Sequence, residues 1–249
     1  MATQYGFGKI VTSGLVLALD AADRNSYVSG STTWNDLSGN GSNGTLTNNP
    51  TYSVSPIPSF DFTTNSTGSI FAGVNQNISF PITTIPTSGS FSVEVWMNRD
   101  TSSIALTDRE SIFSNAGGGD GFRIQITQSP TPGTVHYLIG GVGGVGYSEG
   151  NIGTGYNIAD GRWHQVITIF DRTAQLGSYS VYAYVDGVLR GSASISTGNE
   201  AFTAASPGIS LGCCSKYKGK TSKIVAYNRA LSLTEILQNY NAQKSRFNL

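Results

Sequence analysis

Three short segments in which apolar and polar residues alternate constrain the fold of this chain more than any other feature of its sequence. They lie at residues 91–96, 160–164 and 182–187. Successive side chains of a β-strand point to opposite faces of the sheet, so such a strand buries one face and exposes the other to water. The pattern therefore predicts an all-β protein, an antiparallel sandwich of strands of this kind.

Further segments extend this prediction along the chain. They are residues 15–20, 59–62, 69–71, 78–80, 110–114, 121–127, 134–139, 163–170, 179–185, 188–195, 209–212 and 223–227. Proline, which cannot donate a hydrogen bond to a neighbouring strand, interrupts none of the central segments. Asp186 and Gly187 favour a two-residue hairpin turn between two of them. Because no repeat and no linker divides the 249 residues, we expect one domain.

The composition predicts a neutral polar surface. Charged residues make up 12% of the chain, about half the usual share of ~25%, and the formal net charge is zero. Such a chain has no basic field to attract nucleic acid or an anionic membrane. The one local group of cations follows the last predicted loop, and we interpret it as a solvated strand edge. Its members are Lys216, Lys218, Lys220 and Lys223.

One helix is predicted near the C-terminus, at residues 232–245. Ser232 and Glu235 match a capping box, in which each side chain bonds the backbone of the other residue. Apolar residues then recur on one helical face, and we expect this stripe to pack beside the sandwich. The stripe consists of Leu233, Ile236, Leu237 and Tyr240.

Residues 1–13 contain glycine and are weakly patterned, which predicts an arm or edge strand ahead of a domain at residues 14–249. Its anchoring side chains would be Tyr5, Phe7 and Ile10. The start of the chain matches no signal peptide, and no apolar run is long enough to span a bilayer. We therefore expect synthesis in a cytoplasm and no membrane partner.

The only two cysteines, Cys213 and Cys214, are adjacent in the sequence. Neighbouring cysteines rarely pair with each other, and no third cysteine is available for either of them. The spacing also differs from the C-x-x-C pattern of redox pairs and zinc sites. We therefore expect no disulfide and interpret both residues as small side chains at the start of a strand.

Two motifs of catalysis or cofactor binding overlap at residues 141–150. Residues 141–146 match G-x-G-x-x-G, and residues 146–150 match G-x-S-x-G. Both motifs need a helix directly after the loop, to hold a pyrophosphate or to present a nucleophile. Residues 147–155 are rich in glycine and predict no helix. We interpret the region as a loop between strands.

The three alternating segments, in this order, resemble the laminin-G-like branch of the concanavalin A-like lectin/glucanase superfamily. Three further stretches resemble a narrower group of virion proteins of tailed phages, namely residues 14–23, 34–41 and 225–232. The likeness covers residues 14–246 and implies a jelly-roll sandwich with one C-terminal helix. The acidic pair that often precedes residues 227–231 in that group is replaced here by Ser222 and Lys223.

The resemblance also implies how the remaining candidates for chemistry should be interpreted. In the laminin-G pattern Trp163 is a core residue, and His164 would be its outward or half-buried neighbour. Glycosidases of the superfamily carry several carboxylates on one strand, whereas Glu94 is followed by none at the needed spacing. We therefore expect no enzyme activity and no catalytic residue.

Many relatives hold calcium at the rim of the sandwich, so calcium is the one cofactor that the resemblance suggests. Loop carboxylates are plentiful here, but none forms a dense acidic loop. They include Asp20, Asp23, Asp36 and Asp120. We predict no metal ligand, and no cofactor is required.

Two functions follow from the resemblance. The first is a non-catalytic capsid-decoration protein on a virion surface, which contacts the major capsid protein or another virion protein through residues 1–13 or an exposed strand edge. The second is an adhesion module of a tail or head fibre that binds host polysaccharide. Its candidate glycan-binding residues are Tyr147 and Tyr156, on the glycine-rich loop, and Asp120. The sequence allows a homo-oligomer but encodes no coiled coil.

Overall fold

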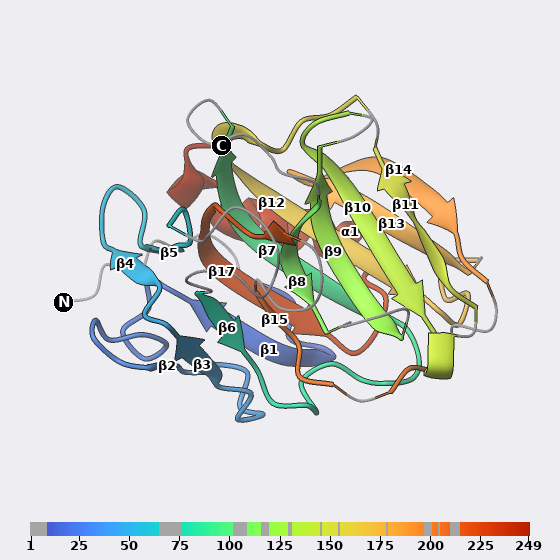
Figure 1. Cartoon of the computed structure of the whole chain (residues 1–249), viewed down its shortest axis with the longest axis horizontal. Coiled ribbons are helices and arrows are strands. Elements are labelled where there is room, and N and C mark those ends of the chain that lie inside the picture. The colour runs from blue at the N-terminus through green and yellow to red at the C-terminus, as the bar shows by residue number, and fades with distance from the viewer. Residues whose placement is uncertain are drawn as a thin grey trace.

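The computed structural model describes most of the chain as one β-sandwich (Figure 1). The described residues are 9–64, 76–101, 109–115, 120–128, 131–144, 146–153, 155–177, 179–196, 201–203, 205–209 and 215–249. The predicted strand at 69–71 and both cysteines lie outside them. Among the described strand pairs, only β16 with β8 is parallel, so the prediction of an antiparallel sandwich is confirmed.

One sheet, called sheet A here, contains the long central strands in the order β14-β13-β12-β7-β17-β5-β4, with β1 also paired to β17. Its strands are β1 (Leu15–Asp20), β4 (Thr51–Ser53), β5 (Ser59–Asp61), β7 (Phe91–Asp100), β12 (Asp160–Asp171), β13 (Ser180–Val185), β14 (Val188–Ser194) and β17 (Lys220–Tyr227). The turn between β13 and β14 has positive φ at both Asp186 (54°) and Gly187 (75°). These angles are those of the two-residue hairpin that the sequence predicts.

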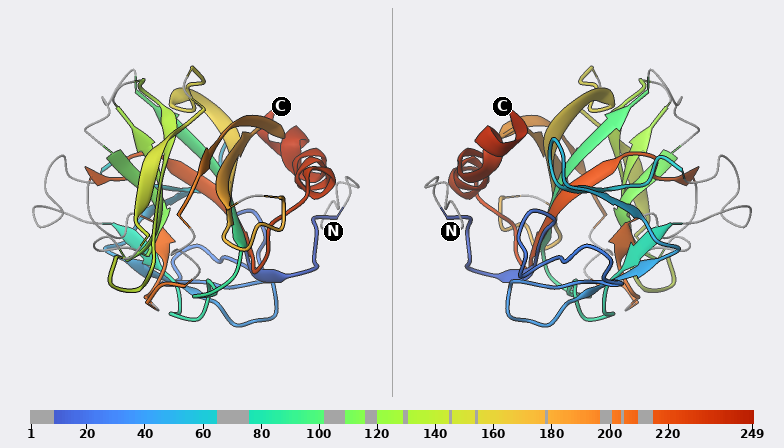
Figure 2. Two further views of the ribbon diagram at one scale, coloured as in Figure 1. Left: turned by 90° about the vertical axis from the view of Figure 1, so that its right-hand side faces the viewer. Right: turned by 90° about the vertical axis from the view of Figure 1, so that its left-hand side faces the viewer.

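The second sheet, sheet B, has the order β11-β10-β9-β8-β15-β6-β3-β2, with β16 paired to β8. Its strands are β2 (Thr33–Trp34), β3 (Gly44–Thr47), β6 (Asn77–Ser79), β8 (Arg109–Ser114), β9 (Gly121–Thr127), β10 (Thr134–Gly140), β11 (Ser148–Ile152), β15 (Gly208–Ile209) and β16 (Ser215–Lys216). Figure 2 shows the two layers from either end of the sandwich. Between them lies one continuous apolar core, to which Val95 of β7, Phe170 of β12 and Ile124 of β9 belong.

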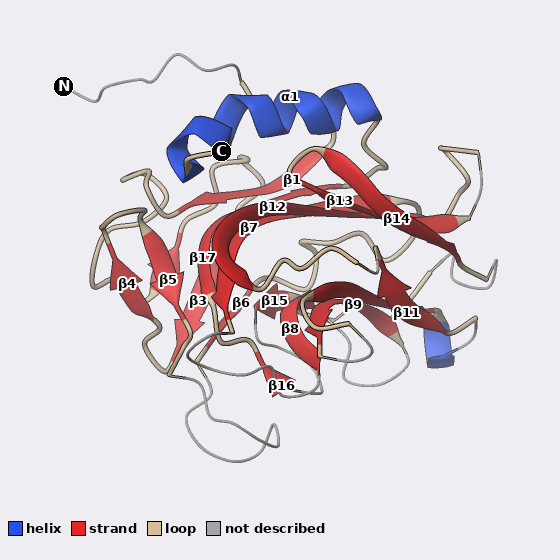
Figure 3. Cartoon of the chain, turned by 90° about the horizontal axis from the view of Figure 1, so that it is seen from above, coloured by secondary structure: helices blue, strands red, loops and turns tan. Residues whose placement is uncertain are grey.

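Helix α1 (Leu233–Gln243) covers the outer face of sheet A, as Figure 3 shows, and the short 3-10 helix η3 (Lys244–Phe247) follows it. The capping box of Ser232 and Glu235 is present, as predicted. The predicted apolar stripe is wrong in part. Ile236 is buried, but Leu233 and Leu237 are 54% and 40% exposed.

Polar residues take the place of that stripe on the buried face of the helix. Asn239 and Gln243 are the other buried residues of α1, and both donate hydrogen bonds to Glu94 on the outer face of β7. A buried carboxylate needs such donors, and this requirement outweighs the burial of two leucines. The helix is therefore turned so that Leu237 lies beside Gly187 at the tip of the β13–β14 hairpin.

The stretches that carry the resemblance to phage proteins hold the fold together. Nη1 of Arg246 donates to both carboxylate oxygens of Asp20 at 2.8 Å, which ties η3 to the end of β1. The carboxylate of Asp36 accepts hydrogen bonds from three backbone amides and one hydroxyl, and so orders the loop after β2. Arg229 pairs with Glu235 at the start of α1. The residues of these motifs therefore stabilise the fold, and their contacts give no indication of a ligand site.

Candidate functional site

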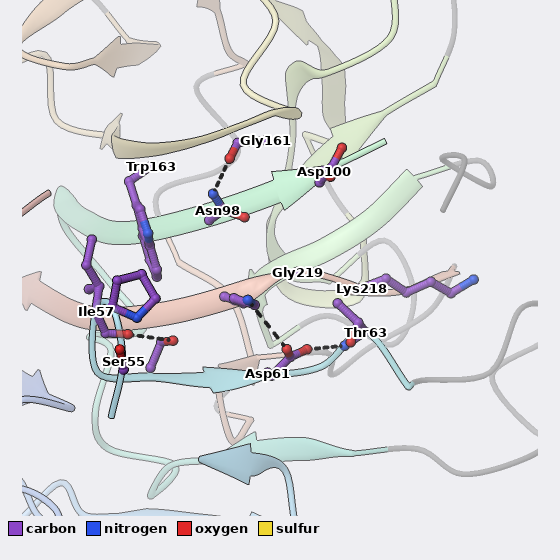
Figure 4. Close-up of a pocket in the computed structure, with 13 residues that line it drawn as sticks. Ser55, Ile57, Asp61, Thr63, Asn98, Asp100, Gly161, Trp163, Lys218 and Gly219 are labelled. Carbon is purple, nitrogen blue, oxygen red and sulfur yellow. Dashed lines mark hydrogen bonds and ion pairs between the residues drawn. The ribbon is translucent and has the colours of Figure 1, made fainter. Parts of the chain in front are cut away.

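A groove of about 630 Å³ crosses the outer side of sheet A beyond the end of α1 (Figure 4). The strands β5, β7, β12 and β17 supply its floor, and the loop between β4 and β5 supplies one wall. Its lining residues are Ser55, Pro56, Ile57, Ser59, Asp61, Thr63, Asn98, Asp100, Gly161, Trp163, Lys218, Gly219 and Lys220. Most of these side chains are polar, with an apolar section at one end.

Trp163 forms the apolar end of the groove together with Ile57 (Figure 4). Its side chain leaves the outer face of β12, where the ring packs on Phe247 of η3 at a centroid distance of 5.3 Å. Phe247 in turn stacks on Trp96 at 4.0 Å. The indole of Trp163 is therefore held by an aromatic group behind it, while part of its surface borders the groove. Such a rigid aromatic wall suits an apolar ring face of a ligand.

Hydrogen bonds fix the polar floor of the groove. The side-chain amide of Asn98 donates to the carbonyl of Gly161 at 2.6 Å. Asp61 accepts a hydrogen bond from the amide of Thr63 at 2.8 Å and lies 3.9 Å from the ammonium of Lys220. Each of these groups keeps further hydrogen-bonding capacity, because a carboxylate accepts up to about four hydrogen bonds. The floor can therefore bind hydroxyl groups.

A buried ion pair lies directly behind this floor. Arg99 and Glu110 form two hydrogen bonds, at 2.8 and 2.6 Å, and neither side chain is exposed. The backbone amide of Lys218 donates a third hydrogen bond to Glu110 at 3.1 Å. Gly219 comes next, and a β-carbon there would collide with the hydroxyl of Tyr217 and the carbonyl of Asn98.

The lysines of this region differ from their predicted role as a solvated strand edge. Lys216 is 8% and Lys218 1% exposed, so both are buried. Burial lowers the pKa of each, although the charge of Glu110 partly opposes the shift at Lys218. Lys223 forms an ion pair with Asp20 at 3.4 Å. The prediction of a solvated edge is therefore wrong for Lys216 and Lys218, because the segment that crosses from sheet B to sheet A buries both side chains.

The interpretation of Trp163 as core and His164 as its outward or half-buried neighbour is also wrong. His164 is 1% exposed and lies on the face of β12 that points into the sandwich, whereas Trp163 is half-buried on the outer face. Nδ1 of His164 lies 2.7 Å from Asp186, and Nε2 lies 3.0 Å from Asp160. The hydroxyl of Tyr156 also donates to Asp186, at 3.3 Å.

This cluster of two carboxylates changes the acid–base behaviour of His164. Burial by itself lowers the pKa of the imidazole, but the hydrogen bonds and charges of Asp186 and Asp160 outweigh that effect and raise the pKa above its usual value. A protonated imidazole donates from both nitrogens, as two acceptors require. The cluster joins the D-G-x-W-H segment to the Asp-Gly turn and so acts as a structural clamp.

Glu94 is a structural residue too. Its carboxylate is fully buried beneath α1 and accepts hydrogen bonds from four neutral side chains. The donors are Trp96 (2.9 Å), Gln165 (2.9 Å), Asn239 (2.8 Å) and Gln243 (3.2 Å). A carboxylate enclosed in this way cannot reach a sugar, so Glu94 does not act as an acid or nucleophile on a ligand in the groove.

The three predicted glycan-binding residues do not form one site. Tyr147 and Tyr156 lie beyond opposite ends of β11, a strand of five residues that spans roughly 16 Å. Tyr147 is 45% exposed, whereas the ring of Tyr156 is covered by the guanidinium of Arg190 at 3.7 Å. Asp120 accepts hydrogen bonds from the amide and hydroxyl of Thr203. Glycan contact through any of these residues stays a prediction.

The predicted arm is docked on the domain where the structure describes it. Val11 is buried, and its backbone bonds Asn239 of α1 and Tyr227 of β17. Ile10 packs partly buried on the same apolar cluster. Tyr5 and Phe7 lie outside the described residues.

Residues 141–150, interpreted from the sequence as a loop, are a loop only in part, because Ser148–Gly150 begin strand β11. The one helix among their described residues is the three-residue 3-10 helix η1 (Val142–Gly144), with positive φ at Gly143. A nucleotide or nucleophile site requires a full helix there. Within the described ranges, no three His, Cys, Asp or Glu side chains gather closely enough to hold a metal ion. Among the same residues, no helix is long and apolar enough to cross a bilayer.

Sequence reasoning missed the groove because its residues come from four distant segments. Asp61, Asn98 and Trp163 occupy strands whose register brings them together, and neither their spacing nor a motif marks them. The only local signal was the cluster of prolines before β5, which indicated a loop but not its place beside β12.

Comparison with known proteins supports the fold. A family model described as the concanavalin A-like lectin/glucanases superfamily matches residues 71–237, well over half of the chain. No curated protein matches the sequence.

Solved structures of similar fold include the binding domain of Paraclostridial Mosquitocidal Protein 1, with a TM-score of 0.63 and 16% identity over 92% of this chain. A second is the ligand-binding domain of botulinum neurotoxin serotype D in complex with N-acetylneuraminic acid, with a TM-score of 0.66 and 15% identity over 94% of this chain. A third is the binding domain of botulinum neurotoxin DC in complex with rat synaptotagmin II, with a TM-score of 0.66 and 13% identity over 93% of this chain. The chain spans only about half of each of these structures, 52% in all three.

Proposed function

Because the chain belongs to the concanavalin A-like lectin/glucanases superfamily, we propose that it is a non-catalytic binding module that holds a saccharide in the groove beside Trp163. The observation that supports this proposal is the combination of one firmly backed indole with a floor of carboxylate and amide groups. Pockets that bind small ligands usually join an apolar wall to a few well-placed polar groups. A sugar ring offers both an apolar face and hydroxyls.

The same groove argues for binding rather than hydrolysis. Glycoside hydrolysis needs a protonated carboxyl group as general acid together with a second carboxylate. The groove is lined by two aspartates, Asp61 and Asp100, and Asp61 already accepts the Thr63 amide and lies 3.9 Å from the ammonium of Lys220. We therefore expect the protein to release no reducing ends from β-glucans.

A glycan array, measured with and without calcium, tests the proposal. The binding of any glycan that it selects is then measured on two matched variants, each of which removes one partly exposed aromatic side chain. Trp163→Ala should abolish the binding of any glycan that the array selects, whereas Tyr147→Ala should leave it unchanged. Binding lost in Tyr147→Ala but kept in Trp163→Ala would move the site to the loop after η1. An array without signal would contradict the proposal altogether.

We infer that the module is carried on the surface of a tailed-phage virion, in line with the resemblance of residues 14–23, 34–41 and 225–232. One observation favours a decoration role through protein contacts. Leu237 of α1 lies beside Gly187 at the tip of the β13–β14 hairpin, and both elements carry exposed apolar side chains of the kind found at protein interfaces. They are Val188 (49% exposed), Leu189 (48%), Leu233 (54%) and Leu237 (40%).

Co-sedimentation with capsids assembled from the major capsid protein tests this second candidate. Removal of residues 1–8 leaves the docked residues 9–13 in place and isolates the contribution of the arm. The double variant Leu233→Ser/Leu237→Ser isolates the helix patch. We expect one of the two changes to abolish co-sedimentation; full binding by both, or no binding by the unmodified protein, would reject the decoration role.

A further inference from the structure

Four residues that line the groove form a single row across the outer face of sheet A. Trp163 of β12 lies opposite Asn98 of β7, and Asn98 lies opposite Lys220 of β17. Lys220 in turn lies opposite Asp61 of β5. Side chains that are directly opposite each other on antiparallel strands point to the same face of the sheet. All four therefore border the groove, and Figure 4 shows Trp163, Asn98 and Asp61 on their separate strands.

The row is longer than one sugar ring. The four strands are consecutive in the sheet, and neighbouring strands lie about 4.8 Å apart, so Trp163 and Asp61 are separated by about 14 Å. A pyranose ring is about as wide as one strand spacing. A monosaccharide that stacks on Trp163 thus reaches Asn98 and leaves the other end of the row empty, whereas three consecutive rings cover the whole row.

The far end of the row presents a charged donor and a charged acceptor that do not bond each other. Nζ of Lys220 lies 3.9 Å from Oδ2 of Asp61, beyond the range of about 2.7–3.2 Å for such a hydrogen bond. The amide of Thr63 bonds the other carboxylate oxygen, Oδ1. Both charged side chains are accessible, at 42% and 23% exposed. Two adjacent sugar hydroxyls can bond both groups, one accepting from the ammonium and one donating to the carboxylate.

We propose that the groove binds three consecutive units of an extended polysaccharide chain, with the first ring on Trp163 and the third at Lys220 and Asp61. This inference rests on the proposed saccharide function and names the ligand class. The chain must be extended because the four residues lie in one line across the strands. Hexoses with equatorial hydroxyls in β-1,4 linkage form such a chain and leave apolar ring faces for the indole. An α-1,4-linked chain coils and leaves the row after the first ring.

Cellotriose and maltotriose are matched probes, because both are glucose trimers and differ only in the configuration of their linkages. Binding can be followed by NMR through the indole N–H signal of Trp163, one of three tryptophans, which Trp163→Phe identifies. We expect cellotriose to bind about tenfold or more tightly than maltotriose and than cellobiose, since only cellotriose gains the hydrogen bonds to charged groups at the far end. Cellotetraose should bind no more tightly than cellotriose.

Asp61→Asn removes the charge at the far end but keeps an oxygen for the amide of Thr63. Cellotriose should then bind as weakly as cellobiose, and an unchanged affinity for cellobiose shows that the variant is folded. Asp23→Asn is the matched control, because Asp23 also accepts a backbone amide two residues further on but lies in the loop after β1, outside the groove. It should leave the affinity for cellotriose unchanged.

Equal affinity for cellobiose and cellotriose, or for the two trimers, would overturn the inference but leave the saccharide function standing. The absence of cellotriose binding would overturn it as well, and other glycans of the array whose binding is lost in Trp163→Ala would then keep the proposed function intact. A preference for cellotriose over cellobiose that survives in Asp61→Asn would reject the third position of the row. The comparison of chain lengths on the unmodified protein stays decisive even where a variant fails to fold.

Discussion

Replacing Asp186 by Asn tests the clamp around His164, and the structure fixes both the size and the pH dependence of the effect. Asn keeps an oxygen for the backbone amide of Gln165 and tolerates the positive φ of the turn, so the hairpin geometry is retained. The change removes one of the two charges that hold the imidazolium. A hydrogen bond to a charged group contributes about 1.5–3 kcal/mol. We expect a loss of about 2 kcal/mol near pH 6, or about 4–8 °C in Tm for a chain of this size.

The pH dependence follows from the direction of the pKa shift at His164. Its pKa is raised in the folded state, so the stabilisation is complete below the unfolded pKa of ~6.5 and is lost as pH rises through the higher folded pKa. A neutral imidazole has only one N–H donor, so one carboxylate then faces a lone pair.

Urea unfolding followed by circular dichroism between pH 6 and pH 9 measures this effect. The difference between the unmodified protein and Asp186→Asn should be largest at pH 6 and shrink toward pH 9. NMR titration of the two histidines, with His136→Gln to assign them, should give His164 a pKa above 6.5. A difference that is constant over the pH range, or one that grows with pH, would refute the reasoning.

Three further predictions concern the supports of the groove and the helix. Asn239→Ala removes one donor to buried Glu94 and should lower the free energy of unfolding by about 1.5–3 kcal/mol, measured in urea; an unchanged value would contradict the role of this network. Gly219→Ala should distort the groove floor, because its β-carbon meets backbone and a buried tyrosine, and a crystal structure with Asn98 unmoved would contradict this. Ser232→Ala removes the cap of α1 and should cost about 1 kcal/mol by thermal unfolding, whereas a change near zero would mean that the capping box contributes nothing.

The sequence predicts the strands and the helix boundaries well because both depend on local patterns. The alternation over residues 91–96 predicts a strand and the Asp-Gly pair predicts a turn, and each prediction depends only on residues that are neighbours in the sequence. Which residues of the helix point toward the sheet depends instead on partners that are distant in the sequence. Glu94 needs amide donors, and this turns Asn239 rather than Leu237 toward β7.

The same reasoning explains why the site was not predicted. Tyr147 and Tyr156 were chosen because they share a loop in the sequence, yet β11 separates them in space. Trp163 was assigned to the core because the laminin-G pattern implies a core tryptophan at this position, and its place beside the groove depends on the loop from Ser55 to Ile57. Lys218 looked like one of several surface lysines until its burial was known.

The most direct test of the account is a crystal structure of the protein soaked with the saccharide that the array selects. We predict density for a sugar ring against the indole of Trp163, with its hydroxyls on the floor formed by Asn98 and Asp61. Density for the saccharide at Tyr147, with the groove containing only water, would contradict the central claim.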